Sequence, residues 1–296
     1  MTKLKRTPIE YFCYDCGLFG KSEAFESAIG QQYCKYIKST CVKPRKSMPE
    51  VKVGICTVGA TVAHSNTVKP VIICPQRFKE DIVFEAIRQK YLSNWNNVTW
   101  IPEVNIGVGG SIDYVAVELN KKGEINDFLC CEIQAAGTTG SPYPFIKDLK
   151  EYGTFNTPSK HKSFGINWAN EFSKTMMQQA YQKGRIIEHW GKGRKIVFII
   201  QDVAMEYLRS VCDFSGVYSY KDSLPIDFCS FKMIKKQRNW NLVLDNINST
   251  DVQGISKLLG GANVDEYLSE EEFKLNIFNK GIQDGILKKE ATTYSL

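Results

Sequence analysis

The clearest pattern in the chain is a pair of segments in which apolar residues flank single polar ones. Ile112, Val115 and Val117 lie in the first segment, and Leu129 and Ile133 lie in the second. Residues 120–123, Asn-Lys-Lys-Gly, form a plausible turn between them. The pattern therefore predicts a hairpin of two central strands across residues 111–136.

Two segments show the spacing of amphipathic helices. Residues 80–92 carry an apolar stripe at Val83, Ala86, Ile87 and Tyr91. From Trp168 to Lys183 an apolar residue recurs at every fourth position, with polar residues opposite; the apolar positions are Trp168, Phe172, Met176 and Ala180. We interpret this stripe as core packing. Lys183 and Arg185, at the end of the second helix, fit helix-end charges and DNA contacts equally well.

The remaining pattern alternates strands with helices. A buried strand is predicted at 195–200, leading into a helix near 205–211, and two further strands at 228–234 and 240–244. The C-terminal part predicts helices at 252–259 and 270–285. This order is typical of an α/β or α+β protein with a mixed sheet flanked by helices.

Size and composition limit the class of protein. A chain of 296 residues can bury a substantial core, as one large domain or as two unequal ones. No apolar run approaches the roughly 20 residues that span a bilayer. The first residues, Met1 to Arg6, are not followed by the apolar segment of a signal peptide. We therefore expect an intracellular, cytoplasmic protein with no membrane partner.

Charge is mildly basic overall and is locally concentrated. There are 38 basic and 32 acidic residues, which gives a net charge of +6. Four basic clusters stand out, at 43–46, 160–162, 192–195 and 235–238, and Trp240 follows the last of them. Each cluster alone is typical of a solvated loop, but several together favour a phosphate-backbone contact surface and hence nucleic acid.

Six of the ten cysteines fall in the first quarter of the chain, which suggests a Cys-rich metal-binding region over 1–80 and a second region over 81–296. In an intracellular protein such cysteines indicate thiolates or metal ligands rather than disulfides. Cys13-x-x-Cys16 has the spacing of a thiolate knuckle, and the alternative set is Cys34, Cys41, Cys56 and Cys74. Four thiolates in tetrahedral array bind zinc or iron. The later cysteines, 130, 131, 212 and 229, fit small buried apolar residues.

The predicted hairpin also carries polar residues that suggest chemistry. Side chains alternate faces along a strand, so Glu132 and Gln134 share a face, and a suitable register adds Asp113. Two converging carboxylates suit Mg²⁺, which many nucleases use to activate water, and Glu103 could supply a third. The alternative is a strand with one wet face, although charges on central strands are costly unless they are used or paired.

A series of short motifs, in order, resembles NotI-type restriction endonucleases. It spans about residues 34 to 200 and comprises Cys34 with Tyr36, Cys41-Val42-Lys43, Gly54 to Val58, Ile73 to Arg77, Gly110 to Tyr114, Cys131 to Ala135, Gly140 to Tyr143 and Met176 to Tyr181. Lys35 and Tyr36 depart from the family pattern, and Cys13 and Cys16 lie outside it. We also expect the chain to be shorter at its C-terminus than the family pattern and its recognition loops to differ, so the resemblance gives no basis for naming a target sequence.

The resemblance implies a PD-(D/E)XK-type nuclease core in which Gln replaces the usual Lys. Its active-site positions fall on Glu103, Asp113, Glu132 and Gln134, with Asp113 and Glu132 binding Mg²⁺. Its four-cysteine site, which holds iron in the family, falls on Cys34, Cys41, Cys56 and Cys74.

The expected function is thus that of a type II restriction endonuclease, cleaving double-stranded DNA with Mg²⁺ as a homodimer, beside a cognate DNA methyltransferase. The alternatives are a structure-specific repair or recombination nuclease and a non-catalytic, metal-stapled DNA-binding protein.

Overall fold

The computed structural model describes residues 4–45, 48–62, 67–107, 110–155, 164–191 and 193–260, together with Gln283. The predicted helix at 270–285 and the basic cluster at 160–162 lie outside the described residues, apart from Gln283, as do Lys46 and Lys192 of two other clusters. Among the described residues, no helix combines the length and the apolarity needed to cross a membrane.

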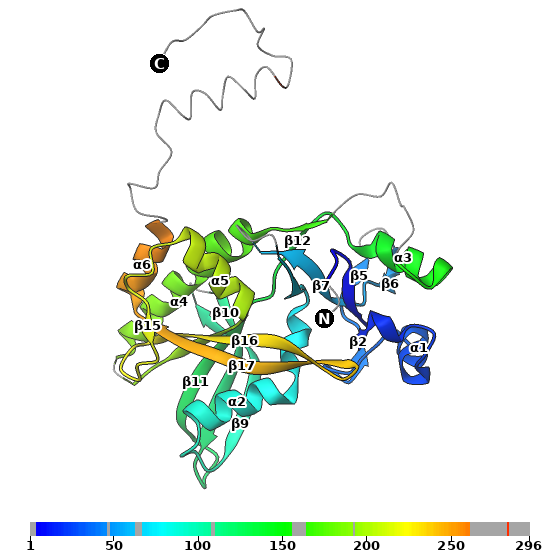
Figure 1. Cartoon of the computed structure of the whole chain (residues 1–296). Helices are drawn as coiled ribbons and strands as arrows, with labels where there is room; N and C mark the ends of the chain where they lie inside the picture. Colours follow the sequence, from blue (N-terminus) through cyan, green and yellow to red (C-terminus); the bar gives the residue numbers. More distant parts are fainter. Residues whose placement is uncertain are drawn as a thin grey trace, which may run out of the picture. The chain divides into compact units, whose positions relative to one another are not determined.

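A seven-stranded mixed sheet is the centre of the fold (Figure 1). Across the sheet its strands are β15 (Tyr218–Ser219), β17 (Asn239–Thr250), β16 (Ile226–Lys236), β14 (Ile196–Gln201), β11 (Ile125–Ile133), β10 (Gly110–Leu119) and β9 (Val98–Gly107). β14 runs parallel to both β11 and β16, and the other neighbours are antiparallel. The prediction of a mixed sheet flanked by helices is confirmed.

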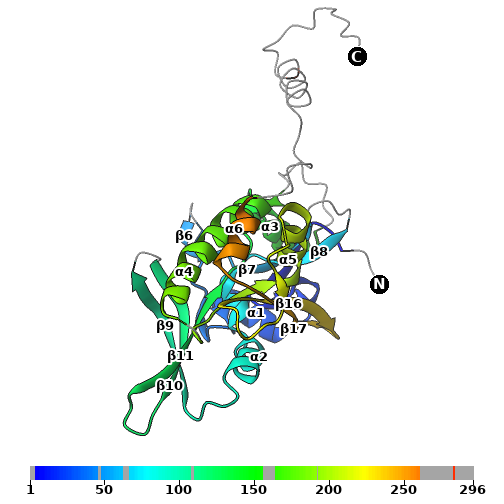
Figure 2. The same ribbon diagram turned by 90° about the vertical axis from the view of Figure 1, so that its left-hand side faces the viewer.

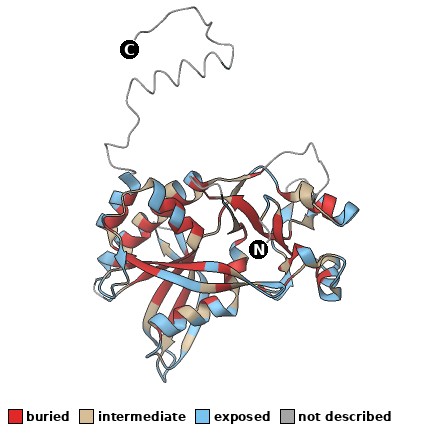
Figure 3. Ribbon diagram, in the orientation of Figure 1, coloured by how far each residue is buried: buried red, intermediate tan, exposed pale blue. Residues whose placement is uncertain are grey.

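The predicted hairpin is also confirmed, as β10 and β11. Tyr114 lies opposite Cys131 and Val115 lies opposite Cys130, so this register places Asp113 across from Glu132. Because successive side chains alternate faces, the central strands contribute to hydrophobic clusters on both sides of the sheet. Figure 3 shows that these strands are largely buried, which makes any charge on them costly.

Helices cover both faces of the sheet, as Figures 1 and 2 show. One face carries a π-helical segment, η3 (Ala169–Met176), with α4 (Met177–His189), α5 (Asp202–Val211) and α6 (Val252–Gly260). The other face carries α2 (Asp81–Tyr91), which buries Val83 and Ile87. α3 (Tyr143–Tyr152) and the short pair β12 (Thr138–Thr139) and β13 (Gly165–Ile166) lie between β11 and η3 along the chain.

The stripe predicted for residues 168–183 does pack in the core. Trp168, Phe172, Met176 and Ala180 are all buried in the cluster that η3 and α4 share with the sheet. The prediction of a uniform α-helix was incomplete, because the first two turns are π-helical. A π turn contains an extra residue and is found in many proteins at functional sites.

The N-terminal residues build a second, four-stranded sheet. It consists of β2 (Tyr14–Asp15), β1 (Pro8–Tyr11), β7 (Ile55–Thr61) and β8 (Val68–Ile72). Around it lie η1 (Cys16–Leu18), α1 (Glu23–Gly30), η2 (Pro75–Lys79) and two small hairpins, β3 (Tyr33–Cys34) with β4 (Ser39–Thr40) and β5 (Pro44–Arg45) with β6 (Met48–Lys52). Tyr11, Phe25 and Val58 belong to the same apolar cluster as Phe198, so this region shares its core with the central sheet.

Candidate active site

Asp113 and Glu132 face each other on the two central strands β10 and β11. The backbone N–H of Ile133 donates to Oδ2 of Asp113 at 2.8 Å, and that of Asp113 donates to Oε1 of Glu132 at 3.3 Å. Within the described part of the chain, the other oxygen of each carboxylate, Asp113 Oδ1 and Glu132 Oε2, has no hydrogen-bond or ion-pair partner. Each side chain is therefore held by one oxygen, and its second oxygen, of the kind that hard cations bind, is left without a partner among the described residues.

Lys183 contacts this pair from α4, the helix that covers this face of the sheet. Its Nζ lies 2.6 Å from Oε1 of Glu132 and donates to the backbone carbonyl of Ser111 at 2.7 Å. Lys183 is only 3% exposed, and its ammonium lies against the sheet. Lys183 is thus neither a surface helix-end charge nor a ready DNA contact, and both of its sequence interpretations were wrong.

The electrostatics of Glu132 reflect this crowded setting. Burial raises the pKa of Glu132 to about 7, and the charge of Asp113 pushes in the same direction, while the hydrogen bond from Lys183 opposes both. Two carboxylates that face each other on a half-buried strand pair repel one another, and a cation between them relieves that repulsion. The donor chemistry of the pair therefore fits a divalent metal ion.

Gln134 follows on the same strand face but is turned toward a different partner. Its amide nitrogen donates to the carbonyl of Ala135 at 3.1 Å and lies 3.5 Å from Oε2 of Glu171, on η3. A Cβ at Gly137 would stand 2.1 Å from Oε1 of Glu171, so the glycine makes room for this carboxylate. Sequence reasoning missed Glu171, because it lies on a different element and no local spacing links it to β11.

Glu103, the predicted third carboxylate, lies on the edge strand β9. Ile112 pairs with Val104 and Tyr114 with Pro102, so the register places Glu103 across from Asp113. It is exposed, has a left-handed backbone with φ 54°, and its side chain makes no hydrogen bond or ion pair with another described residue. No group of three or more His, Cys, Asp or Glu side chains among the described residues is arranged to hold a metal ion. Glu103 is therefore near the pair in register without joining it in a three-carboxylate cluster.

Five cysteines line one small pocket in the N-terminal region, and they are Cys13, Cys34, Cys41, Cys56 and Cys74. The Sγ of Cys13 lies 3.5 Å from that of Cys34 and 3.9 Å from that of Cys56. Ligands around a tetrahedral zinc at ~2.3 Å are separated by roughly 3.8 Å, so these two spacings are those of neighbouring thiolate ligands, although no three of the five cysteines are arranged around a common metal position. The structure brings Cys13 into this pocket and leaves Cys16 in the main apolar cluster.

Comparison with known protein families matches residues 31–223 to the family described as Restriction endonuclease NotI. The chain belongs to the NotI restriction endonuclease family. The resemblance inferred from the motifs is thereby confirmed. A search of curated proteins found no match.

The NotI match includes Asp113, Glu132 and Lys183 but begins after Cys13 and ends before the β16–β17 hairpin. The described elements outside the match are therefore β1, β2, η1 and α1 on the N-terminal side, and β16, β17 and α6 on the C-terminal side; β16 and β17 lie between β14 and β15 in the central sheet.

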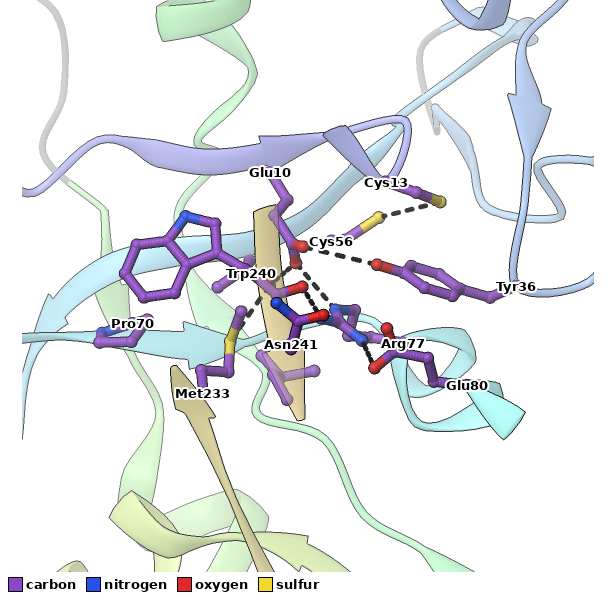
Figure 4. Close-up of polar contacts among 12 residues, drawn as sticks. Glu10, Cys13, Tyr36, Cys56, Pro70, Arg77, Glu80, Met233, Trp240 and Asn241 are labelled. Carbon is purple, nitrogen blue, oxygen red and sulfur yellow. Dashed lines mark hydrogen bonds and ion pairs between the residues drawn. The ribbon is translucent and has the colours of Figure 1, made fainter. Parts of the chain in front are cut away.

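A buried arginine ties these two outer parts together (Figure 4). Arg77 is fully buried; its Nε lies 3.0 Å from Oε2 of Glu10 on β1, and its Nη1 lies 2.5 Å from Glu80. Nη2 donates at 3.0 Å to the carbonyl of Trp240 on β17. Tyr36, beside the cysteine pocket, donates its hydroxyl to Oε1 of Glu10 at 3.4 Å, and its ring lies under the guanidinium. Arg77 thus links the cysteine pocket to the β16–β17 hairpin.

The basic clusters are not all free for DNA. Lys195 is buried against Asp227 at 3.0 Å, and the partly exposed Arg194 pairs with Asp127, so both described cations of the cluster at 192–195 already have an acidic partner within the protein. At the turn of the β16–β17 hairpin, Lys236 and Arg238 are exposed. The hairpin turn is therefore the basic cluster that best retains the character of a phosphate-contact surface.

Proposed function

We propose that this chain is a type II restriction endonuclease with a PD-(D/E)XK-type core, hydrolysing phosphodiester bonds in double-stranded DNA with Mg²⁺. The observation that carries the proposal is the facing pair Asp113 and Glu132, in which each carboxylate keeps one oxygen without a partner among the described residues. A strand that merely has one wet face would not need backbone N–H groups and a buried lysine to hold its acids.

In this proposal Asp113 and Glu132 hold the metal. When bound, Mg²⁺ supplies a more acidic water molecule and offsets charge on the phosphate. Gln134 is neutral and cannot remove a proton, so its role is to orient the water with its amide. Glu103, on the neighbouring strand, remains the proposed third carboxylate.

The proposed substrate also suggests partners. A palindromic site is read most simply by two copies related by a two-fold axis, so we propose a homodimer. The exposed cations of the hairpin turn would contact the DNA backbone. A cognate methyltransferase would protect the host's own sites.

The test is digestion of plasmid and genomic DNA of known sequence, with and without Mg²⁺. The proposal requires discrete fragments with defined ends that appear only with Mg²⁺, and sequencing those ends gives the target site. Glu132→Gln should lose cleavage while still binding DNA.

The hairpin offers a matched control. Glu118 and Asp127 also face each other across β10 and β11, but they lie nearer the turn and their side chains point to the other face. Asp127→Asn should therefore cut at close to the normal rate. Equal cutting by Glu132→Gln and the unmodified protein would overturn the assignment. Cleavage confined to branched or nicked DNA would favour a structure-specific nuclease, and binding without cleavage in Mg²⁺ or Mn²⁺ a non-catalytic DNA-binding protein.

We also propose that the cysteine pocket holds one structural iron or zinc ion. The resemblance points to Cys34, Cys41, Cys56 and Cys74, while the sulfur spacings support Cys13 as a ligand in place of Cys41, which is less buried than the others. Burial raises the pKa of the Cys74 thiol, so a thiolate there needs a cation beside it.

Elemental analysis of purified variants decides the ligand set. Cys13→Ser should lose the metal and Cys41→Ser should keep it if the sulfur spacings identify the ligands; the reverse result restores the set implied by the resemblance. Cys16→Ser is the control, since Cys16 packs in the main apolar cluster. Unmodified protein without metal would refute the proposal.

A further inference from the structure

The proposed active site carries excess negative charge, and the strands β10 and β11 provide no cation at that position to balance it. Asp113 and Glu132 bring two carboxylates together, and the next side chain on that face of β11, Gln134, is neutral. Glu171 adds a third acid near Gln134. A buried carboxylate without a compensating cation is strongly destabilising, so the fold must provide a positive group from elsewhere.

Lys183 is that group, and close packing of α4 against the sheet fixes its position. The next residue, Gly184, packs against β16, where an added Cβ would lie 2.5 Å from Cδ1 of Ile226. This close approach of helix and sheet lets the buried lysine reach across to β10 and β11. Ala180 and Ile187, on the same helical face, are fully buried and anchor the turns on either side.

The contacts of the ammonium are divided between two strands. An ammonium has three N–H donors. One contacts Oε1 of Glu132 on β11 at 2.6 Å and another the carbonyl of Ser111 on β10 at 2.7 Å. Oε1 also accepts the N–H of Asp113, so this oxygen is fixed from two sides. The carboxylate therefore has little freedom to rotate, and Oε2 is the oxygen left for a ligand.

We propose that Lys183 is a positioning residue of the catalytic centre, which holds Oε1 of Glu132 so that Oε2 stays available to the metal beside Asp113. The proposal rests on the function proposed above and deepens it. Lys183 acts through Glu132 and through the tether to Ser111, and it provides the positive charge that Gln134 does not.

The first test measures the pair without any cleavage. Lys183→Met keeps most of the length of the side chain but leaves Glu132 buried without its cation, and we expect the melting temperature to fall by on the order of 10 °C. Adding Glu132→Gln removes the unpaired charge and should restore most of that loss. Lys174→Met, a substitution at an exposed position on η3, should leave the melting temperature within about 2 °C. Additive losses in the double variant would overturn the pairing.

The second test measures cleavage. Groups that hold a metal ligand in place typically contribute 10–100-fold to metal affinity or activity, so Lys183→Met should cut DNA about 10–100-fold more slowly. Lys183→Ala leaves a cavity of nearly the volume of the side-chain atoms that it removes, which correspond to propylammonium. Propylammonium in the assay should restore activity at least fivefold, and 1-propanol, similar in size but uncharged, should not. A residue that only fills space would respond to both compounds alike.

The outcomes separate the two proposals. If the unmodified protein does not cleave DNA, the proposed function has failed, and only the melting temperatures of the single and double variants test the pairing of Lys183 with Glu132. If the unmodified protein cleaves but Lys183→Met cuts within threefold of its rate, the positioning role is wrong. Rescue by neither compound, or by both equally, also overturns it. If Lys183→Ala does not fold, the Lys183→Met variant decides.

Discussion

Replacing Arg77 by Met should destabilise the protein far more than the loss of an ordinary ion pair. Arg77 is fully buried and Glu10 is 1% exposed, so the substitution leaves a buried carboxylate whose hydrogen-bond partners among the described residues are Thr57, at 2.5 Å, and Tyr36. Removing one member of a buried pair costs about 3–5 kcal/mol. For a chain of this size, that corresponds to a fall in melting temperature of roughly 6–20 °C.

The pH dependence has a defined sign. Burial raises the pKa of Glu10, and Arg77 opposes that rise. Without Arg77 the pKa rises further, so the folded variant binds a proton more readily than its unfolded chain does. The stability that this proton provides is present at low pH and lost as pH rises, and the deficit of Arg77→Met should therefore shrink as pH falls.

The assay is thermal and urea unfolding followed by circular dichroism, at two pH values. Glu10→Gln in the Arg77→Met background removes the unpaired charge and should recover part of the loss. The control is Lys69→Met: its partner Glu206 is 43% exposed, and surface pairs contribute about 0–1 kcal/mol. If Arg77→Met costs no more than Lys69→Met, the argument from burial is refuted.

Two further predictions concern α5 and α6. Burial, with a smaller effect of Asp245, raises the pKa of Asp202 to about 6, so the stability from its neutral form is present below pH ~4 and lost as pH rises through about 6. Asp202→Asn should therefore stabilise by up to about 3 kcal/mol at pH 7 and by almost nothing at pH 4 in urea titrations; a pH-independent effect would contradict this. Gly254→Ala should destabilise by at least about 1–3 kcal/mol, because its Cβ would lie 2.4 Å from the carbonyl oxygen of Gly216. Gly30→Ala meets no atom within 4 Å and should cause no loss in the same unfolding assay.

Local pattern was sufficient to predict the elements that form the central sheet. Alternation predicted the β10–β11 hairpin, and the fourfold spacing from Trp168 predicted a buried helical face. Both succeed because neighbours in sequence are neighbours in space within a hairpin or a helix. The sequence placed Asp113 on the face of Glu132 only on condition of a suitable register, and the observed pairing around the turn at 120–123 supplies that register.

The parts of the site that were missed depend on contacts between distant segments. Glu171 reaches Gln134 only because η3 packs beside β11, and Lys183 reaches Glu132 only because α4 lies close to the sheet. Cys13 was one of the alternatives that the sequence offered, but its place in the pocket also depends on distant segments, because β1 pairs with β7, which carries Cys56. No spacing between these residues in the sequence contains that information.

The strands β10 and β11 supply the two carboxylates of the proposed site, and α4 supplies the cation, so the site is complete only when the helix has packed on the sheet. The two carboxylates come together as soon as the hairpin forms, but without α4 they would be two acids near each other with no cation. Docking of α4 buries Lys183 against Glu132 and its apolar neighbours against the sheet in the same step. Because a lone buried charge is costly on either side of that contact, the packed helix and the ion pair stabilise each other. The arrangement of the two carboxylates with Lys183 is therefore a property of the completed core, and substitutions that loosen α4 should disturb the proposed active site even when they lie far from Asp113.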